Sequence, residues 1–251
     1  MKTFTLMGIP LQSVTADEAL ALVRSWLASP GAQHSIYTPN PEILWNARRD
    51  EAVRAALLAG DLLVPDGIGI VLAAHLQGEK EVHRLPGIEL AEAIIRQLKP
   101  RLFLLGAKPG VARRAGARME EWGAKVVGTR HGYFSTAESD QVAAEVNRHR
   151  PDVLLVALGS PRQEAFLGLM RSRLKVPVAM VVGGSFDVWA GDKRRAPRLI
   201  RELGIEWVWR TAHEPSRLLR LVALIGFVWT MAFRRGHNDS GSAGEGRENR
   251  E

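Results

Sequence analysis

The stretch Val153-Leu-Leu-Val-Ala157, followed by Gly159-Ser-Pro-Arg-Gln-Glu164 and by an amphipathic pattern over residues 161–174, decides the fold. A second apolar run, Val178-Ala-Met-Val-Val182, comes soon after it. Apolar runs of strand length without polar alternation are typical of strands that are covered on both faces. Two such strands joined by a helix form the basic unit of a parallel sheet. The stretch therefore predicts a parallel sheet packed between helices.

The same alternation of strands and helices extends through the N-terminal part of the chain. Thr15-Ala-Asp-Glu18 is a capping box, which predicts the start of a helix that runs to about residue 28. Residues 3–6 are predicted to form an edge strand. Further strands are predicted over residues 34–37, 62–64, 102–105 and 125–127, and further helices over about 42–59, 110–122 and 136–148. We expect an α/β fold, Rossmann-like and mostly parallel with helices on both faces, over residues 1–192.

Composition supports one globular domain with an appendage. The chain has 251 residues, of which 46% are hydrophobic and 24% charged, and this balance excludes a wholly disordered protein. It contains no Cys, which excludes disulfides, thiol nucleophiles and thiolate metal sites. The seven His have no spacing typical of metal ligands, so we expect no metal site built by the protein. No pattern of a signal peptide is visible at the N-terminus.

The positive charge is concentrated near the C-terminus. The formal net charge is +7, and residues 193–236 alone contain ten Arg or Lys and three Glu. The apolar run 221–233 lies in the same segment, and as a helix it would span about 20 Å, too short for a hydrocarbon core of about 30 Å. We expect residues 193–236 to form a basic, amphipathic helical appendage on an anionic membrane surface. Residues 237–251 are predicted to be disordered.

Three arginines of the appendage suit a phosphorylated ligand. Arg217 and Arg220 share one helical face, whereas Pro215 interrupts the pattern before Arg210. Arginines of this kind can pair with a diphosphate. The same segment could instead be a buried helix, a contact in a homo-oligomer, or part of a nucleic-acid-binding face.

Small and ionisable residues follow almost every predicted strand. Ligands of parallel sheets bind at the carboxyl ends of the strands, so these positions are candidate site residues. Asp66 follows an apolar strand and could act as a general base, or it could belong to a turn or cap a helix. Thr38 and Asn40, held between prolines, could bind a sugar, or they could cap the next helix.

The loops after the later strands suit a nucleotide. Backbone amides of Gly106–Gly110 could bind a phosphate at a helix start, although neither a Walker loop nor a dinucleotide fingerprint is present. Ser160 and Gln163 fit a capping box, and Arg162 and Gln163 could still face a ligand. Gly184 and Asp187 suit close approach of a ligand and contact with a ribose. A nucleotide-dependent oxidoreductase is the enzyme alternative at this stage.

An ordered set of motifs over about residues 3–235 resembles one family. The motifs are Thr38-Pro-Asn-Pro-Glu42, Pro65-Asp-Gly67, Arg84-Leu-Pro-Gly87, Leu104-Leu-Gly-Ala-Lys-Pro-Gly110, His131-Gly-Tyr-Phe134, Gly159-Ser-Pro-Arg-Gln-Glu164, Gly183-Gly-Ser-Phe-Asp187, Arg195-Ala-Pro197, and Glu206-Trp-Val-Trp-Arg210 through Glu214-Pro-Ser-Arg217. In this order they resemble the WecG/TagA/CpsF glycosyltransferases. The resemblance implies an inverting transferase that moves N-acetylmannosamine from UDP to undecaprenyl-diphosphate-linked N-acetylglucosamine, in teichoic acid or a related polymer. A donor carrying N-acetylmannosaminuronic acid stays an alternative.

The resemblance also implies roles for individual residues. Asp66 matches the catalytic base, and the substrate-binding positions are Thr38, Asn40, Arg84, Gln163, Arg210, Arg217 and Arg220. The expected nucleotide contacts are Gly106, Tyr133, Gly159, Gly184 and Asp187. The family implies no cofactor and no required metal, and it implies a cytoplasmic enzyme, peripheral on the inner face of the bacterial cell membrane. The expected partners are a UDP-sugar, the lipid-linked acceptor and the membrane surface, and no nucleic acid.

Overall fold

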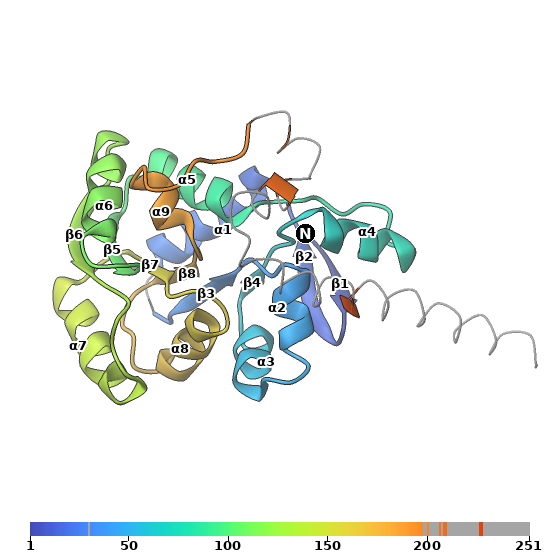
Figure 1. Cartoon of the computed structure of the whole chain (residues 1–251), viewed down its shortest axis with the longest axis horizontal. Helices are drawn as coiled ribbons and strands as arrows, with labels where there is room; N and C mark the ends of the chain where they lie inside the picture. The colour runs from blue at the N-terminus through green and yellow to red at the C-terminus, as the bar shows by residue number, and fades with distance from the viewer. Residues whose placement is uncertain (30, 198–199, 201–205, 207, 210–225, 228–251) are drawn as a thin grey trace, which may run out of the picture.

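The computed structural model describes residues 1–29, 31–197, 200, 206, 208–209 and 226–227. Within them, six strands form one sheet in the order β4-β3-β8-β7-β5-β6, and neighbouring strands pair in parallel (Figure 1). The strands are β3 (His34–Tyr37), β4 (Leu62–Leu63), β5 (Arg101–Gly106), β6 (Lys125–Arg130), β7 (Val153–Ala157) and β8 (Val178–Val181). The predicted α/β fold with a parallel sheet is confirmed.

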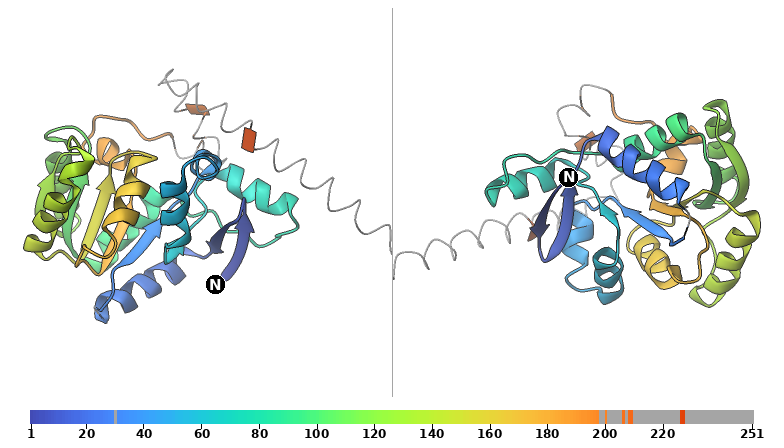
Figure 2. Two further views of the ribbon diagram at one scale, coloured as in Figure 1. Left: turned by 90° about the horizontal axis from the view of Figure 1, so that it is seen from below. Right: turned by 180° about the vertical axis from the view of Figure 1, so that it is seen from behind.

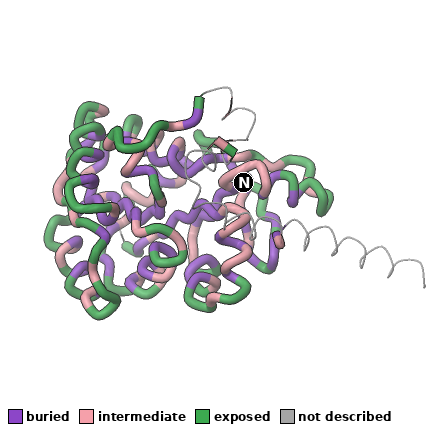
Figure 3. The backbone as a smooth tube through the Cα atoms, viewed as in Figure 1, coloured by how far each residue is buried: buried purple, intermediate pink, exposed green. Residues whose placement is uncertain are grey.

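Two hydrophobic cores cover the two faces of the sheet. Side chains alternate along each strand, so Leu102 and Leu104 of β5 belong to one core and Phe103 and Leu105 to the other. The first core also holds α1 (Ala16–Ala28), α5 (Gly87–Leu98), α6 (Val111–Glu121) and α9 (Ser185–Trp189). The second holds α2 (Pro41–Asn46), α3 (Glu51–Leu58), α4 (Ile68–Leu76), α7 (Ser139–His149) and α8 (Arg162–Met170). Figure 2 shows the helices around the sheet, and Figure 3 shows the buried backbone concentrated in the central strands.

The N-terminal strand forms a hairpin of its own. Strand β1 (Lys2–Leu6) pairs antiparallel with β2 (Ile9–Ser13), and the turn residues Met7 and Gly8 both have positive φ. The prediction of a strand at residues 3–6 is therefore confirmed, but β2 was not expected. Pro10 fits in β2 because a two-stranded ribbon consists of edge strands, where Pro is tolerated.

The structure confirms one of the predicted helix starts and corrects two other helix predictions. The capping box of Thr15 and Glu18 is present at α1. The single helix predicted over residues 42–59 is wrong, because Asp50 accepts a hydrogen bond from the N–H of Val53 and starts α3 anew after α2. The capping box predicted at Ser160 is also wrong. Helix α8 has Pro161 at its N-cap position after a cis Ser160–Pro161 bond, and the Gln163 side chain is used elsewhere.

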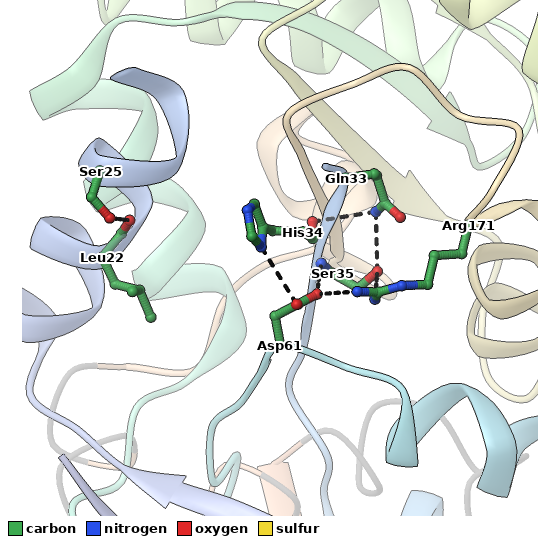
Figure 4. A network of polar contacts seen from close by, with 7 residues as sticks. All are labelled: Leu22, Ser25, Gln33, His34, Ser35, Asp61 and Arg171. Atoms are coloured by element: carbon green, nitrogen blue, oxygen red, sulfur yellow. Dashed lines mark hydrogen bonds and ion pairs between the residues drawn. The ribbon is translucent and has the colours of Figure 1, made fainter. Parts of the chain in front are cut away.

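A polar network joins two neighbouring strands and a helix at the amino ends of the strands. One carboxylate oxygen of Asp61, just before β4, accepts from the Ser35 N–H and from Arg171 at the end of α8, both at 2.8 Å. The other lies 3.4 Å from Nδ1 of His34. Gln33 donates to the Ser35 hydroxyl at 3.0 Å (Figure 4). The network therefore fixes β3, β4 and α8 at the rim opposite the strand carboxyl ends.

Most of the predicted appendage and all of the predicted tail lie outside the described residues. Of the appendage, Phe227 is fully buried in the core that α2 and α3 share. Gly226 lies against Trp45 of α2, where an added Cβ would come within 2.5 Å of the ring. In the described part of the chain, no helix has the length and apolar composition that crossing a membrane requires.

Candidate functional site

Backbone hydrogen bonds gather the loops that follow β3 and β4. The N–H of Asp66 donates to the carbonyl of Pro39, and the N–H of Leu85 donates to the carbonyl of Pro65, each at 3.0 Å. These bonds align residues 38–40, 64–66 and 84–85 side by side. The predicted residues Thr38, Asn40, Asp66 and Arg84 therefore come from adjacent segments, and Asp66 and Arg84 are half-buried.

Thr38 is held by the start of α5. Its side chain is buried, and a Cβ built on Gly87 would lie 2.6 Å from the Thr38 hydroxyl oxygen. No real side chain approaches so closely, so the residue at position 87 must be Gly for Thr38 to keep this place. Packing against Thr38 is therefore one reason for the Gly in the Arg84-Leu-Pro-Gly87 motif.

Capping of a helix explains the position of Asn40 but not that of Asp66. Asn40 is the N-cap of α2, and its Oδ1 accepts from the N–H of Ile43 at 2.9 Å, which leaves its amide NH₂ as the group that could contact a ligand. Asp66 is not the N-cap of α4, because that position belongs to Gly67, with φ of 96°. The capping interpretation is therefore confirmed for Asn40 and wrong for Asp66.

The expected nucleotide residues Gly106, Gly159 and Tyr133 are brought together by the loops after β5, β6 and β7. A Cβ on Gly106 would lie 2.2 Å from the carbonyl oxygen of Ala157, so only Gly allows this approach of β5 to β7. The N–H of Gly132 donates to the carbonyl of Ala107 at 2.9 Å and holds the loop after β6 against the loop after β5. The side chain of Tyr133 is 64% exposed and so available as a stacking surface.

Arg162 stabilises the loop after β6. Its guanidinium donates to the carbonyls of Gly132 and Phe134 and lies 4.5 Å from the centroid of the Phe134 ring. These contacts use two of the five guanidinium N–H donors and fix the residues on either side of Tyr133. Contact of the exposed Arg162 with a ligand stays a prediction.

Gln163 connects the loop after β7 to the loop after β8. Its Oε1 accepts from the N–H of Gly183 at 3.1 Å, and its Nε2 donates to Glu164 at 2.9 Å. The side chain is buried. The bond to Gly183 fixes the segment that carries Gly184 and Asp187. The carboxylate of Asp187 lies 3.9 Å from Nζ of Lys193.

Three glycines leave the carboxyl rim open. Gly67, Gly159 and Gly183 have positive φ, and a Cβ on any of them would have no atom of the described residues within 4 Å. They follow β4, β7 and β8. Backbone groups therefore border open space along this rim, as close approach of a ligand requires.

The strand order separates the candidate residues into two groups. Thr38, Asn40, Arg84 and Asp66 lie at the β4–β3 end, and the expected nucleotide residues follow β8, β7, β5 and β6. Neighbouring strands are about 4.8 Å apart, so the two groups together extend along the rim over several strands. A cavity of about 500 Å³ lies at the β5–β6 end of the second group and is lined by Lys108, Arg113, Arg130 and His131, among others.

Other predicted residues lie outside the site that the structure describes. Arg210, Arg217 and Arg220 are not among the described residues. In the part of the chain that the structure describes, no three His, Asp or Glu side chains lie close enough together to hold a metal ion.

Glu164 is a buried carboxyl to which sequence reasoning gave no role. The residue is fully buried, and burial raises the pKa of its carboxyl, with a smaller contribution from the nearby carboxylate of Glu42. Glu in the first turn of an amphipathic helix is typically exposed, so the sequence offered no sign of burial beyond its place in the Gly159–Glu164 motif.

Comparison with known proteins identifies the family. The model of the "Glycosyl transferase WecG/TagA/CpsF family" matches residues 4–240. Two similar proteins, from Staphylococcus aureus strains MW2 and NCTC 8325, are each named N-acetylglucosaminyldiphosphoundecaprenol N-acetyl-beta-D-mannosaminyltransferase. Each is 29% identical over 231 residues, which is 90% of this chain and 91% of the relative.

The match covers the whole described sheet, both groups of site residues and the motifs that connect them. It therefore replaces the oxidoreductase alternative. The chain belongs to the WecG/TagA/CpsF family and is a glycosyltransferase.

Proposed function

We propose that this enzyme transfers N-acetylmannosamine from UDP-N-acetylmannosamine to undecaprenyl-diphosphate-linked N-acetylglucosamine, forming a β-linkage for a cell-wall polymer. The names of the similar proteins support this acceptor and this sugar. The observation that carries the proposal is the hydrogen bond between the Asp66 N–H and the Pro39 carbonyl. It brings Asp66 beside the segment that carries Thr38 and Asn40, at one end of an open rim.

Asp66 would act as the general base. Its carboxylate takes the proton from the acceptor hydroxyl as that oxygen bonds to the anomeric carbon of the donor. The bond from the anomeric carbon to the diphosphate oxygen breaks, and UDP leaves with the electron pair. Attack from the side opposite UDP inverts the anomeric configuration, which makes a β-linkage from an α-linked donor.

The nucleotide would lie along the second group of residues. Tyr133 offers a ring for the base, and Asp187 a carboxylate for the ribose hydroxyls. Negative charge that develops on the leaving diphosphate needs donors and cations. Arg84 would supply one cation, because the bond from Leu85 to Pro65 holds its segment beside that of Asp66, and the arginines predicted at 210, 217 and 220 would supplement it. No metal is required in this scheme.

Because the proposed acceptor is linked to a lipid, the enzyme would act at a membrane surface. We propose that residues 193–236 bring the enzyme to the inner face of the cell membrane, because this segment combines the excess positive charge with apolar and Trp-rich sequence. A variant truncated after residue 192 should lose liposome binding and transfer to lipid acceptor while still binding UDP. Unchanged transfer would overturn the role of the appendage.

A donor and acceptor matrix tests the function. The purified protein is incubated with UDP-N-acetylmannosamine, its uronic acid or UDP-N-acetylglucosamine, each with and without lipid-diphosphate N-acetylglucosamine, and UDP release and product mass are measured. We expect acceptor-dependent UDP release with the first donor and a product heavier by one N-acetylhexosamine. A preference for the uronic acid would identify the alternative donor, and no acceptor-dependent release with any donor would reject the proposal.

A further inference from the structure

We propose that Glu164 is a positioning residue, which acts through Gln163 to fix the Gly183 amide and the loop that follows β8. This inference rests on the proposed nucleotide site, because the fixed loop contains Gly184 and leads into helix α9, which carries Asp187. It assigns a role to a buried carboxyl that the proposed chemistry does not use.

The contacts form one chain from the α8 helix to the β8 loop. Glu164 Oε1 accepts from Gln163 Nε2 at 2.9 Å, and Gln163 Oε1 accepts from the Gly183 N–H at 3.1 Å. The first bond orients the Gln163 amide, since only one of its two orientations turns Oε1 toward Gly183. Without Glu164, the amide loses the partner that sets this orientation.

The loop depends on this contact more than an ordinary loop would. Gly183 has φ of 52°, and a Cβ there would have no atom of the described residues within 4 Å, so side-chain packing does not hold the residue. Its backbone conformation therefore depends on hydrogen bonds. The bond to Gln163 joins Gly183 to helix α8.

The protonated acid suits this role better than the carboxylate. Glu164 is fully buried, and its Oε2 and the nearby Ser160 Oγ are both buried with no hydrogen-bond partner among the described residues. The Ser160 hydroxyl lies close enough to oppose the rise in the Glu164 pKa, without the geometry of a hydrogen bond. A buried carboxylate with only one of its two oxygens hydrogen-bonded is costly, whereas a neutral carboxyl keeps Oε1 as an acceptor and gains a donor at Oε2.

The test compares three variants with the wild type. Glu164→Gln mimics the protonated acid in shape and hydrogen bonding, whereas Glu164→Met keeps the length and helix propensity of the side chain but cannot accept. Met170→Ala is the control, because it removes a core contact on the same helix away from Gly183. Three quantities are measured, namely the exchange rate of the Gly183 amide proton, the Kd for UDP and the KM for the lipid acceptor, and the melting temperature reports stability.

We expect Glu164→Met to speed exchange at Gly183 and to raise the Kd for UDP, each by about tenfold, the value of one lost hydrogen bond. The KM for the lipid acceptor should stay unchanged. Glu164→Gln should stay within about twofold of wild type in all three. Met170→Ala should lower the melting temperature but leave Gly183 exchange and the Kd near wild type.

The outcomes separate this inference from the proposed function. Wild-type exchange and affinity in Glu164→Met would overturn the positioning role, and a Glu164→Gln variant as weak as Glu164→Met would show that the charge itself is needed. If Glu164→Met does not fold, Glu164→Asp replaces it, because the shorter side chain draws the acceptor away from Gln163. If the wild type does not bind UDP, the proposed function fails, while the Gly183 exchange rates still decide the contact.

Discussion

The backbone N–H of Asp66 donates a 3.0 Å hydrogen bond to the carbonyl of Pro39. This bond continues the pairing of β3 and β4 beyond the carboxyl ends of both strands. It places Asp66 beside the segment that carries Thr38 and Asn40. Backbone pairing thus brings the proposed base to the proposed sugar-binding residues, and the following predictions test how that geometry is kept.

Gly87→Ala should displace Thr38. The new methyl group would lie 2.6 Å from the Thr38 hydroxyl oxygen, and overpacking of this kind costs about 1–3 kcal/mol. We expect a lower free energy of unfolding and a slower transfer of sugar from the donor. Gly31→Ala is the matched control, since it meets no atom within 4 Å and should change stability by no more than about 0.5 kcal/mol. Equal behaviour of the two variants in urea unfolding would contradict the packing argument.

Stability should depend on pH through Glu164. Its pKa in the folded protein is raised above the ordinary value of 4.5, chiefly by burial. Below pH 4.5 both the folded and unfolded chains keep the proton, and above it the unfolded chain releases the proton first, so stability falls as pH rises. Glu164→Gln does not titrate. The difference in free energy of unfolding between this variant and the wild type should therefore shift in favour of the variant as pH rises above 4.5, by at most about 1.4 kcal/mol per pH unit.

Chemical unfolding of both proteins at several pH values between 5 and 8 measures this gain. Glu42 and Tyr37 also lie close enough to influence the titration of the buried group, and burial keeps the Tyr37 hydroxyl protonated by raising its pKa. A difference between variant and wild type that is independent of pH would show that Glu164 is ionised in the folded protein.

Asp61→Ala should lower stability without weakening UDP binding. The substitution removes the acceptor for the Ser35 N–H and for Arg171 at the rim opposite the site, a loss of about 1–3 kcal/mol. Asp140→Ala removes an ion pair with Arg173 in which both side chains are more than half exposed, and it should cost little. Thermal unfolding and UDP titration check both variants. A large rise in the Kd of Asp61→Ala would mean that the two rims are coupled.

Arg162→Lys should weaken nucleotide binding. A Lys ammonium cannot donate to the carbonyls of Gly132 and Phe134 together while covering the Phe134 ring. We expect the loop around Tyr133 to loosen and the Kd for UDP to rise by about tenfold. Arg118→Lys, an exposed residue of α6, serves as the control. Calorimetric titration would reject the loop role if both variants bind UDP like the wild type.

The strands and their order along the chain were predictable because a strand that is buried on both faces appears in the sequence as a continuous apolar run. Val153–Ala157 and His34–Tyr37 match the predicted strands residue for residue. The N-terminal hairpin and the break between α2 and α3 were missed for local reasons. An edge strand such as β2 tolerates Pro10. Asp50 starts a new helix within a stretch whose helical pattern looked continuous from residue 42 to 59.

The site was predictable in its positions but not in its internal contacts. Asp66, Thr38 and Gly184 follow strands, and parallel strands bring their ends to one rim. Whether a polar side chain faces a ligand or the protein depends on partners distant in sequence. Arg162 and Gln163 proved to bind neighbouring loops, and Glu164 proved to be buried. Such contacts leave no periodic pattern, so only the structure reveals them.

The transfer rate of Asp66→Asn tests the central claim most directly. Asparagine keeps the size of the side chain and hydrogen bonding but cannot take the acceptor proton at this rim. The account predicts a loss of transfer from UDP-N-acetylmannosamine to lipid-linked acceptor of at least about a hundredfold, with the Kd for UDP and the melting temperature near wild type. A folded Asp66→Asn protein that transfers sugar at a rate close to wild type would contradict it.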